Sequence, residues 1–171
     1  IYMGKRGGAS TITQQLARQI FVGVRSRNIL KTVFQKAQEW VISVQLEQRY
    51  TKKEILAMYL NNYDFGYQAD GVQSAAKIFF DKTPQTLSIE ESATLVGMLK
   101  NSSYYNPIRR SELVRKRRNI VFQQMVRNKV ITERVRDSLS KLPLVITYTP
   151  QSHREGLATY FRAYLKEFMN G

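Results

Sequence analysis

A short run near the start of the sequence combines residues that could bind an anion or a sugar. Residues 7–18 read GGASTITQQLAR, with Thr11 and Gln14 at the spacing of a capping box, so a helix is expected to begin at Ile12. The free backbone N–H groups of a helix start, together with the helix dipole, attract anions. The alternative is a well-capped surface helix without a ligand. The side chains that could add hydrogen bonds or charge are Ser10, Thr11, Thr13, Gln14, Gln15 and Arg18.

A lysine and a glutamate on one expected helix face offer a second kind of chemistry. Lys36 and Glu39 are three residues apart and therefore share a face. Because Glu39 stands beside the apolar residues Trp40 and Val41, its carboxylate is expected to be partly buried with a shifted pKa, which suits acid–base catalysis. The alternative is a surface ion pair that contributes at most about 0.5 kcal/mol. Glu47 lies near the same face and could instead support helix packing or capping.

Basic residues concentrate between residues 109 and 118. This run predicts a solvated helix face, or salt bridges to neighbouring helices. Nucleic-acid binding is the rival interpretation, but no recognised nucleic-acid motif accompanies the run, so no nucleic-acid partner is expected.

The composition is that of a basic globular domain. A chain of 171 residues with 43% hydrophobic residues is long enough for one domain with a core. The net charge of +14 implies an anionic partner: nucleic acid, an acidic membrane surface or a phosphorylated substrate. The absence of cysteine excludes disulfides and thiolate chemistry, and the single His153 cannot build a multi-histidine metal site. No apolar run reaches the roughly 20 residues of a membrane-spanning helix.

The apolar periodicity is helical nearly throughout. Ile12, Leu16 and Ile20 repeat every four residues, and the helix expected over residues 29–50 carries an apolar stripe made of Val33, Ala37, Trp40, Val41 and Val44. Two further capping boxes predict helix starts after Thr51 and Ser88, with Glu54 and Glu91 as their partners.

The remaining segments complete a helical pattern that stops near residues 143–150. Further helices are expected at about residues 72–80, 111–128 and 132–141, with a loop at 101–107. Alternating β-branched residues predict one strand at 144–149. The tail at 156–169 is amphipathic.

These segments, in this order, resemble the motifs of the family-51 peptidoglycan glycosyltransferases, the transglycosylase domains of class A bifunctional penicillin-binding proteins. Residues 8–16 reproduce the family's second motif, Gly-x-Ser-Thr-Ile-Thr-Gln-Gln-Leu. The third, fourth and fifth motifs are matched at residues 35–47, 52–61 and 117–125, and two intervening elements at 71–76 and 105–107. Four motifs in order are far more specific than any one alone.

Two departures from the family pattern bear on activity. The first motif, which carries the glutamate regarded as the general base, is expected upstream of Gly8 and is not found, so this fragment alone is expected to be inactive. Gln35 replaces the arginine of the third motif, and Lys31 stands where another arginine often occurs. Both changes weaken bidentate phosphate binding, because lysine is a point charge and glutamine has no charge.

The resemblance implies a mainly α fold, with a lysozyme-like helical lobe and a smaller mobile membrane-proximal lobe that is incomplete here. It implies a glycosyltransferase domain at residues 1–142, lacking the first motif. Residues 143–171 would form a linker toward a transpeptidase domain, because 153–161 resemble that link. His153 would then be structural and not catalytic.

The resemblance also implies a reaction and the residues that carry it. Members polymerise lipid II into glycan strands, with inversion and release of undecaprenyl pyrophosphate. Glu39 would be the second catalytic carboxylate, near the pyrophosphate, and could share a Mg²⁺ or Mn²⁺ ion with it. The residues that would bind phosphate or sugar are Ser10, Thr11, Gln14, Gln15, Arg18, Lys31 and Lys36.

The implied partners are lipid II, the growing glycan chain, the membrane surface, phosphoglycolipid inhibitors such as moenomycin, and other cell-wall synthesis proteins. The implied location is the outer (periplasmic) face of the bacterial cytoplasmic membrane, with an anchoring segment that is not present here. Two alternatives stay open: a non-catalytic domain that binds lipid II or a phosphoglycolipid, and a lysozyme-like glycan hydrolase. A hydrolase needs no pyrophosphate clamp, so the expected anion site at residues 8–18 argues against it.

Overall fold

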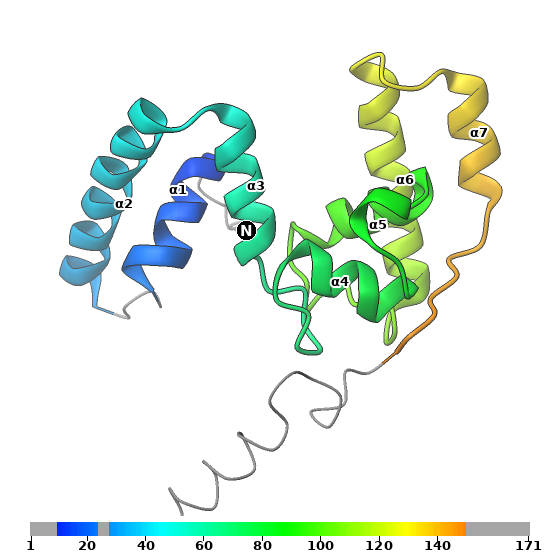
Figure 1. Cartoon of the computed structure of the whole chain (residues 1–171), viewed down its shortest axis with the longest axis horizontal. Helices are drawn as coiled ribbons and strands as arrows, with labels where there is room; N and C mark the ends of the chain where they lie inside the picture. The colour runs from blue at the N-terminus through cyan, green and yellow to red at the C-terminus, as the bar shows by residue number, and fades with distance from the viewer. Residues whose placement is uncertain (1–9, 24–27, 150–171) are drawn as a thin grey trace, which may run out of the picture. The chain divides into compact units, whose positions relative to one another are not determined.

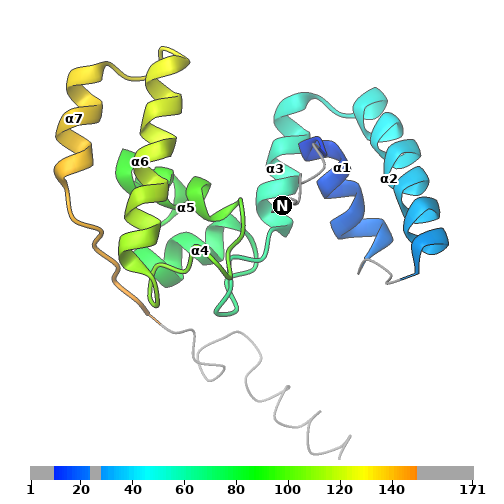
Figure 2. The same cartoon turned by 180° about the vertical axis from the view of Figure 1, so that it is seen from behind.

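The computed structural model describes residues 10–23 and 28–149, and within them the fold is mainly α, as the sequence predicts (Figures 1 and 2). These residues divide into two compact units, 10–64 with 70–73 and 65–69 with 74–149. Over the same ranges there is no strand, only an isolated antiparallel bridge between Asp64 and Asp70. The helices are α1 (Ile12–Ala17), α2 (Ile29–Arg49), α3 (Lys52–Asn62), α4 (Gly71–Phe80), α5 (Ile89–Met98), α6 (Ser111–Arg127) and α7 (Glu133–Lys141), with a π-helical turn at Arg18–Val22 and a 3₁₀ turn at Pro84–Thr86.

In the first unit, α1 lies between α2 and α3 and contacts both (Figures 1 and 2). Leu16 and Ala17 on α1 are fully buried. The other buried apolar side chains of this three-helix core are Leu46, Ile55 and Tyr59. The short helix α1 is therefore held from two sides, which fixes the residues at its start.

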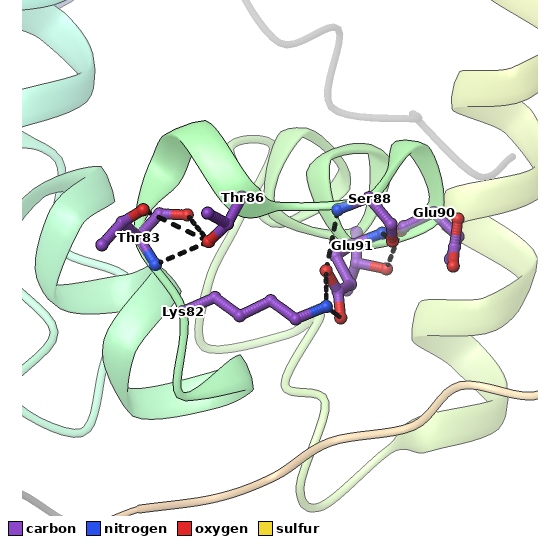
Figure 3. Close-up of polar contacts among 7 residues, drawn as sticks. Lys82, Thr83, Thr86, Ser88, Glu90 and Glu91 are labelled. Atoms are coloured by element: carbon purple, nitrogen blue, oxygen red, sulfur yellow. Dashed lines mark hydrogen bonds and ion pairs between the residues drawn. The ribbon is translucent and has the colours of Figure 1, made fainter.

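Three capping boxes form where the sequence predicts them. In each box, the hydroxyl of the first residue accepts the backbone N–H three positions on, and the side chain there accepts the N–H of the first residue. The pairs are Thr11–Gln14, Thr51–Glu54 and Ser88–Glu91. In the last box the ammonium of Lys82 also lies 2.8 and 2.9 Å from the two carboxylate oxygens of Glu91, so it ties the end of α4 to the start of α5 (Figure 3).

The apolar stripe of α2 lies on the surface, although its periodicity alone would predict that it faces the core. The exposed residues of this stripe, called here the α2 apolar face, are Val33, Ala37, Trp40, Val41 and Val44. Instead, α2 buries Glu39, Ser43 and Leu46. Periodicity identifies the apolar side of a helix but not its neighbours, and the neighbours α1 and α3 pack against the opposite side.

The helix α1 is shorter than its apolar spacing predicts. It ends at Ala17, and a π-helical turn then carries the chain to Gly23. Of the three residues that repeat every four positions, only Leu16 is buried, while Ile12 and Ile20 are exposed. The four-residue spacing therefore does not mark one buried face, because Ile12 is the first residue of α1 and Ile20 lies beyond its end.

A glycine makes the connection between α3 and α4. Gly71 opens α4 with a φ of +79°, and its N–H donates to the carbonyl of Tyr63 at 2.9 Å. A Cβ atom at this position would lie 2.5 Å from the backbone oxygen of Asn61. Both the backbone angle and the close approach therefore require glycine.

The second unit is built on α4 and on the contact between α5 and α6. The α5–α6 contact is close at Gly97, where a Cβ atom would lie 3.1 Å from Cγ of Arg117. Helix α6 continues into α7 as a helical hairpin, with Thr132 as the cap of α7 (Figure 1). The buried residues of α4 in this unit are Ala75, Ala76, Ile78, Phe79 and Phe80.

Residues 144–149 do not form the predicted strand. The N–H groups of Thr147 and Thr149 donate to the carbonyls of Phe79 and Ile78, each at 2.9 Å. These carbonyls belong to the last turn of α4, which has no intrahelical donors for them. The extended segment therefore caps a helix and does not pair with another strand.

Arg118 fixes the beginning of this extended segment. It is 1% exposed, although the sequence places it in a basic run expected to face solvent. Its guanidinium donates to the backbone oxygens of Leu142 at 2.7 Å and Pro143 at 3.2 Å. The guanidinium also lies over the ring of Phe122. The run around Arg118 is thus only in part a solvated face.

Along residues 10–23 and 28–149, no helix has both the length and the apolar character to cross a bilayer. Some features singled out in the sequence lie outside these ranges: the glycines at 7 and 8, His153 and the amphipathic tail at 156–169.

Candidate active site

Lys36 joins Ser10, two residues before α1, to the buried Glu39 of α2. Its ammonium donates to Oγ of Ser10 at 3.2 Å and forms an ion pair with the carboxylate of Glu39. The pairing follows from the three-residue spacing on one helix, as predicted. An ammonium has three N–H donors, so a third acceptor can still be bound.

Burial separates this pair from an ordinary surface ion pair. The side chain of Glu39 is 4% exposed, whereas that of Lys36 is 37% exposed. A buried carboxylate depends on its partners, because removing a charge from water costs several kcal/mol unless it is compensated, an order-of-magnitude figure. Glu39 is therefore buried as predicted, but on the face opposite Trp40. Ser43, one turn later, is buried too, and its hydroxyl donates to the backbone oxygen of Glu39.

Gln15 links α1 to α3 and to Ser10, which in turn contacts Lys36 on α2. Its Nε2 donates to the backbone oxygen of Ser10 at 3.4 Å, and its Oε1 accepts the hydroxyl of Tyr59 at 3.3 Å. Tyr59 lies on α3 and is 3% exposed. Hydrogen bonds therefore run without a break across the first unit through five residues, called here the site network: Tyr59, Gln15, Ser10, Lys36 and Glu39.

Thr11 and Gln14 cap the start of α1 with their side-chain oxygens. Oγ1 of Thr11 accepts the N–H of Gln14 at 3.2 Å, and Oε1 of Gln14 accepts the N–H of Thr11 at 3.3 Å. Among residues 10–23 and 28–149, the side-chain NH₂ of Gln14 has no hydrogen-bond partner. The structure thus assigns these two residues a capping role, while their predicted contact with substrate stays a prediction.

Of the other two predicted cations, one lies near the site network. Arg18 opens the π-helical turn and is half-buried. Burial and then Tyr63 raise the pKa of Tyr59, and the charge of Arg18 acts in the opposite direction. Lys31 is exposed in the first turn of α2, and within the described part of the chain no hydrogen bond or ion pair joins it to the network. The structure therefore brings together Ser10, Gln15, Lys36 and Glu39, with Arg18 beside them.

Glu47 is exposed and lies apart from the network. It borders a groove of about 550 Å³ in the first unit. The residues that line this groove are Ile12, Thr13, Glu47, Tyr50, Lys52, Ile55 and Leu56. Of these, Thr13 is among the side chains that could add a hydrogen bond to an anion or sugar, and no member of the site network lines the groove.

Sequence reasoning missed two buried hydroxyl groups of this site, those of Tyr59 and Ser43. Tyr59 falls in an apolar stripe, where its hydroxyl gives no separate signal, although it lies within the segment that matches the family's fourth motif. Ser43 stands one turn after Glu39, and a serine at that spacing often donates to the carbonyl four residues before it. That spacing was the signal available.

The side chains present do not by themselves form a metal site. In residues 10–23 and 28–149, no three Asp, Glu, His or Cys side chains lie close enough to share a metal ion. The carboxylate of Glu39 is already paired with Lys36. A Mg²⁺ or Mn²⁺ ion at Glu39 would need phosphate and water oxygens for its other ligands. The metal role of Glu39 stays a prediction.

The Tyr-Asn-Pro element of the second unit stabilises its own loop. Oδ1 of Asn106 accepts the N–H groups of Ile108 at 3.1 Å and Arg109 at 3.0 Å, and its Nδ2 donates to the hydroxyl of Tyr67 at 3.4 Å. These bonds give Asn106 a structural role in the loop, so its presence before Pro107 does not require a ligand.

The basic run after this loop is partly solvated, as expected. Arg115 pairs with Glu112 at 2.9 Å on the exposed side of α6. Arg110 lies over the ring of Tyr104, with 5.0 Å to the centroid. These surface contacts contrast with the burial of Arg118.

The site network can bind an oxyanion. Lys36 offers a partly exposed ammonium with one donor to spare, and Gln15 offers one remaining amide N–H. A cation and an amide beside a half-buried serine suit a phosphate, which accepts several hydrogen bonds at once. Glu39 holds the ammonium in place from the buried side. Preorganised donors of this kind stabilise charge that develops on a leaving oxygen.

Comparison with known proteins identifies the family of this chain. The profile of the transglycosylase family matches residues 2–126. Penicillin-binding protein 1A of Haemophilus influenzae is 39% identical over 145 residues, which cover 85% of this chain and 16% of that protein. Penicillin-binding protein 2a of Streptococcus pneumoniae serotype 2 is 42% identical over 123 residues, 72% of this chain and 16% of that protein. The chain thus spans about a sixth of the length of these relatives.

A solved structure supports the same relationship. The crystal structure of penicillin-binding protein 1A from Haemophilus influenzae superposes with a TM-score of 0.56 and 31% sequence identity. The match covers 72% of this chain and 18% of that one.

Proposed function

Because this chain belongs to the transglycosylase family of peptidoglycan glycosyltransferases, we propose that it is the domain that polymerises lipid II in a class A penicillin-binding protein. The observation that carries the proposal is the site network, in which Lys36 is held by the buried Glu39 and by Ser10. Lipid II carries a pyrophosphate, and the network presents a cation and an amide suited to it.

The reaction joins two saccharides and releases a lipid pyrophosphate. The 4-hydroxyl oxygen of the acceptor forms a bond to C1 of the growing chain, the bond from C1 to the phosphate oxygen breaks, and C1 is inverted. The hydroxyl proton goes to a general base, and the electron pair of the broken bond leaves with the pyrophosphate. The enzyme must therefore stabilise negative charge on the leaving group.

The residues of this chain act on the leaving group. Lys36 would donate its third N–H to a phosphate oxygen while Glu39 and Ser10 hold the other two. Gln15 would add an amide N–H, and Arg18 a second positive charge nearby. Glu39 keeps the ammonium charged and oriented, so its effect on the reaction passes through Lys36. A Mg²⁺ or Mn²⁺ ion shared by Glu39 and the pyrophosphate would add positive charge at the leaving group.

The remaining partners belong to the same proposal. The substrates are lipid II and the growing glycan chain, and a phosphoglycolipid such as moenomycin would compete through its phosphate. The site of action is the outer face of the cytoplasmic membrane, where each basic residue near an anionic surface contributes about 1 kcal/mol. Other cell-wall synthesis proteins are expected neighbours.

The test is polymerisation of fluorescent lipid II by an intact protein that carries this domain. Glu39→Gln is expected to lower the rate by about 100-fold or more, the range of a lost catalytic group. The matched control is Glu47→Gln on the same helix, which is expected to stay within about twofold because the residue is exposed and outside the network. Moenomycin binding without polymerisation by the unchanged protein would favour a binding domain. Normal polymerisation by Glu39→Gln would overturn the role of Glu39.

A further inference from the structure

The side-chain amide of Gln15 is held at both ends, by Tyr59 and by the backbone oxygen of Ser10. A glutamine side chain ends in a carbonyl oxygen that accepts and an NH₂ group that donates, and the two can exchange places by rotation about one bond. The orientation that the chain adopts is therefore decided by the neighbours of the amide.

The backbone oxygen of Ser10 selects one orientation, and Tyr59 holds the amide in it. On the α3 side, the hydroxyl of Tyr59 donates to Oε1 of Gln15 at 3.3 Å. On the other side, the backbone oxygen of Ser10 accepts from Nε2 at 3.4 Å. A backbone carbonyl can only accept, so the flipped amide would place two acceptors against each other at Ser10.

The hydroxyl of Tyr59 stays protonated and can therefore donate to Gln15. Tyr59 is almost completely buried, and burial raises its pKa above the ordinary value of 10.0, with Tyr63 acting in the same direction and Arg18 against it. The hydroxyl therefore keeps its proton throughout the physiological range. A buried hydroxyl also needs a partner, and the partner that the structure gives it is Gln15.

From these contacts we infer that Tyr59 is a positioning residue, which acts through Gln15 by holding Oε1 of the amide at α3, so that the N–H groups stay beside Ser10 and a bound oxyanion. The inference rests on the proposed function, because it assigns the oxyanion to the substrate pyrophosphate. Without the tyrosine hydroxyl, Oε1 of Gln15 loses its partner on α3, and the amide is no longer held in the position that keeps its N–H groups beside Ser10.

The test compares single and double variants of the intact protein in lipid II polymerisation. Tyr59→Phe is expected to raise KM by about 10-fold, the effect of one hydrogen bond to a charged group, with kcat changed by less than about threefold. In a Gln15→Ala background, the same substitution is expected to leave KM unchanged. The control is Tyr50→Phe, a half-exposed tyrosine that follows α2 in the same unit and lies outside the network.

A second readout does not depend on catalysis. Denaturant unfolding is measured for the unchanged protein, Tyr59→Phe, Gln15→Ala and the double variant. The two substitutions are expected to have non-additive effects on the free energy of unfolding, which gives the coupling between Tyr59 and Gln15. Additive effects on the free energy of unfolding would overturn the hydrogen bond between Tyr59 and Gln15, whether or not the protein polymerises lipid II. A clear coupling with an unchanged KM would overturn the positioning role alone. If the coupling is found but the unchanged protein does not polymerise lipid II, the proposed function is contradicted. The hydrogen bond between Tyr59 and Gln15 then stands, but the role of Tyr59 in binding the pyrophosphate is overturned.

Discussion

Lys36 and Glu39 form an ion pair whose partners differ in their access to water: the carboxylate is buried and the ammonium is about one-third exposed. The two substitutions that break this pair are therefore not equivalent. Removal of the glutamate leaves a lysine that water can solvate. Removal of the lysine leaves a buried carboxylate that has lost its positive partner and that water cannot reach.

Lys36→Met is thus expected to lower the free energy of unfolding by about 2 kcal/mol, the scale of a buried polar group that loses its partner. Glu39→Gln is expected to cost less. Urea unfolding followed by circular dichroism measures both changes. The double variant Lys36→Met/Glu39→Gln should recover much of the loss, and a double variant as unstable as Lys36→Met alone would contradict this account.

Substitution at Gly71 is expected to destabilise the link between α3 and α4. Gly71→Ala forces a non-glycine residue into the left-handed region, at about 1–2 kcal/mol, and adds a clash with the backbone of Asn61. The matched control is Gly66→Ala, whose φ is +82° but whose added Cβ would meet no atom within 4 Å. Thermal unfolding should therefore rank Gly71→Ala well below Gly66→Ala, and equal losses would show that the clash is relieved at no cost.

Loss of Arg118 is expected to release the segment that caps α4. Arg118→Met removes the donors to Leu142 and Pro143 and should cost about 2–3 kcal/mol, the range for hydrogen bonds from a charged group. Amide hydrogen exchange at Thr147 and Thr149 should become faster, because both N–H groups lie in this segment. Lys116→Met on the exposed side of α6 is the control, expected within about 0.5 kcal/mol. Unchanged exchange in Arg118→Met would show that the segment is held by other contacts.

The box at the start of α5 predicts a dependence on acid. Burial raises the pKa of Glu91, but the hydrogen bonds and charge of Lys82 and the N–H of Ser88 outweigh it, so the pKa lies below the ordinary 4.5. A carboxyl whose pKa is lower in the folded state stabilises the fold above its unfolded pKa and loses that contribution as the pH falls through the folded value.

Glu91→Gln should therefore reduce the loss of stability as the pH falls below about 4.5. Urea midpoints measured from pH 7 to the acid limit of folding test this. Lys82→Met removes the cation that pairs with Glu91, so stability should also depend less on pH below about 4.5. Adding Glu91→Gln to Lys82→Met should change this dependence little further. An acid slope that Glu91→Gln leaves unaltered would contradict the prediction.

The features that could be predicted from the sequence depend on contacts within one turn of helix. The three capping boxes, including Thr51–Glu54, formed as expected because both partners lie within four residues. The pairing of Lys36 with Glu39 was predicted for the same reason. The helix positions followed from apolar spacing.

The features that could not be predicted depend on which elements meet in space. The α2 apolar face is exposed because α1 and α3 pack against the other side, and periodicity does not encode that choice. Thr147 and Thr149 have strand-like chemistry, but the free acceptors they reach are helix carbonyls. Arg118 looks like its basic neighbours in sequence and differs only in burial. Tyr59 gave no signal because its ring belongs to the core while its hydroxyl belongs to the site.

The exposure of Trp40 has a practical consequence for spectroscopy. It is the only tryptophan in the chain, and 63% of its surface is exposed on the α2 apolar face. Indole emission shifts to shorter wavelength when water around the ring is replaced by apolar groups. Intrinsic fluorescence of this domain therefore reports the environment of a single helix face, and titration with vesicles, substrate or a partner can be followed there without any attached dye.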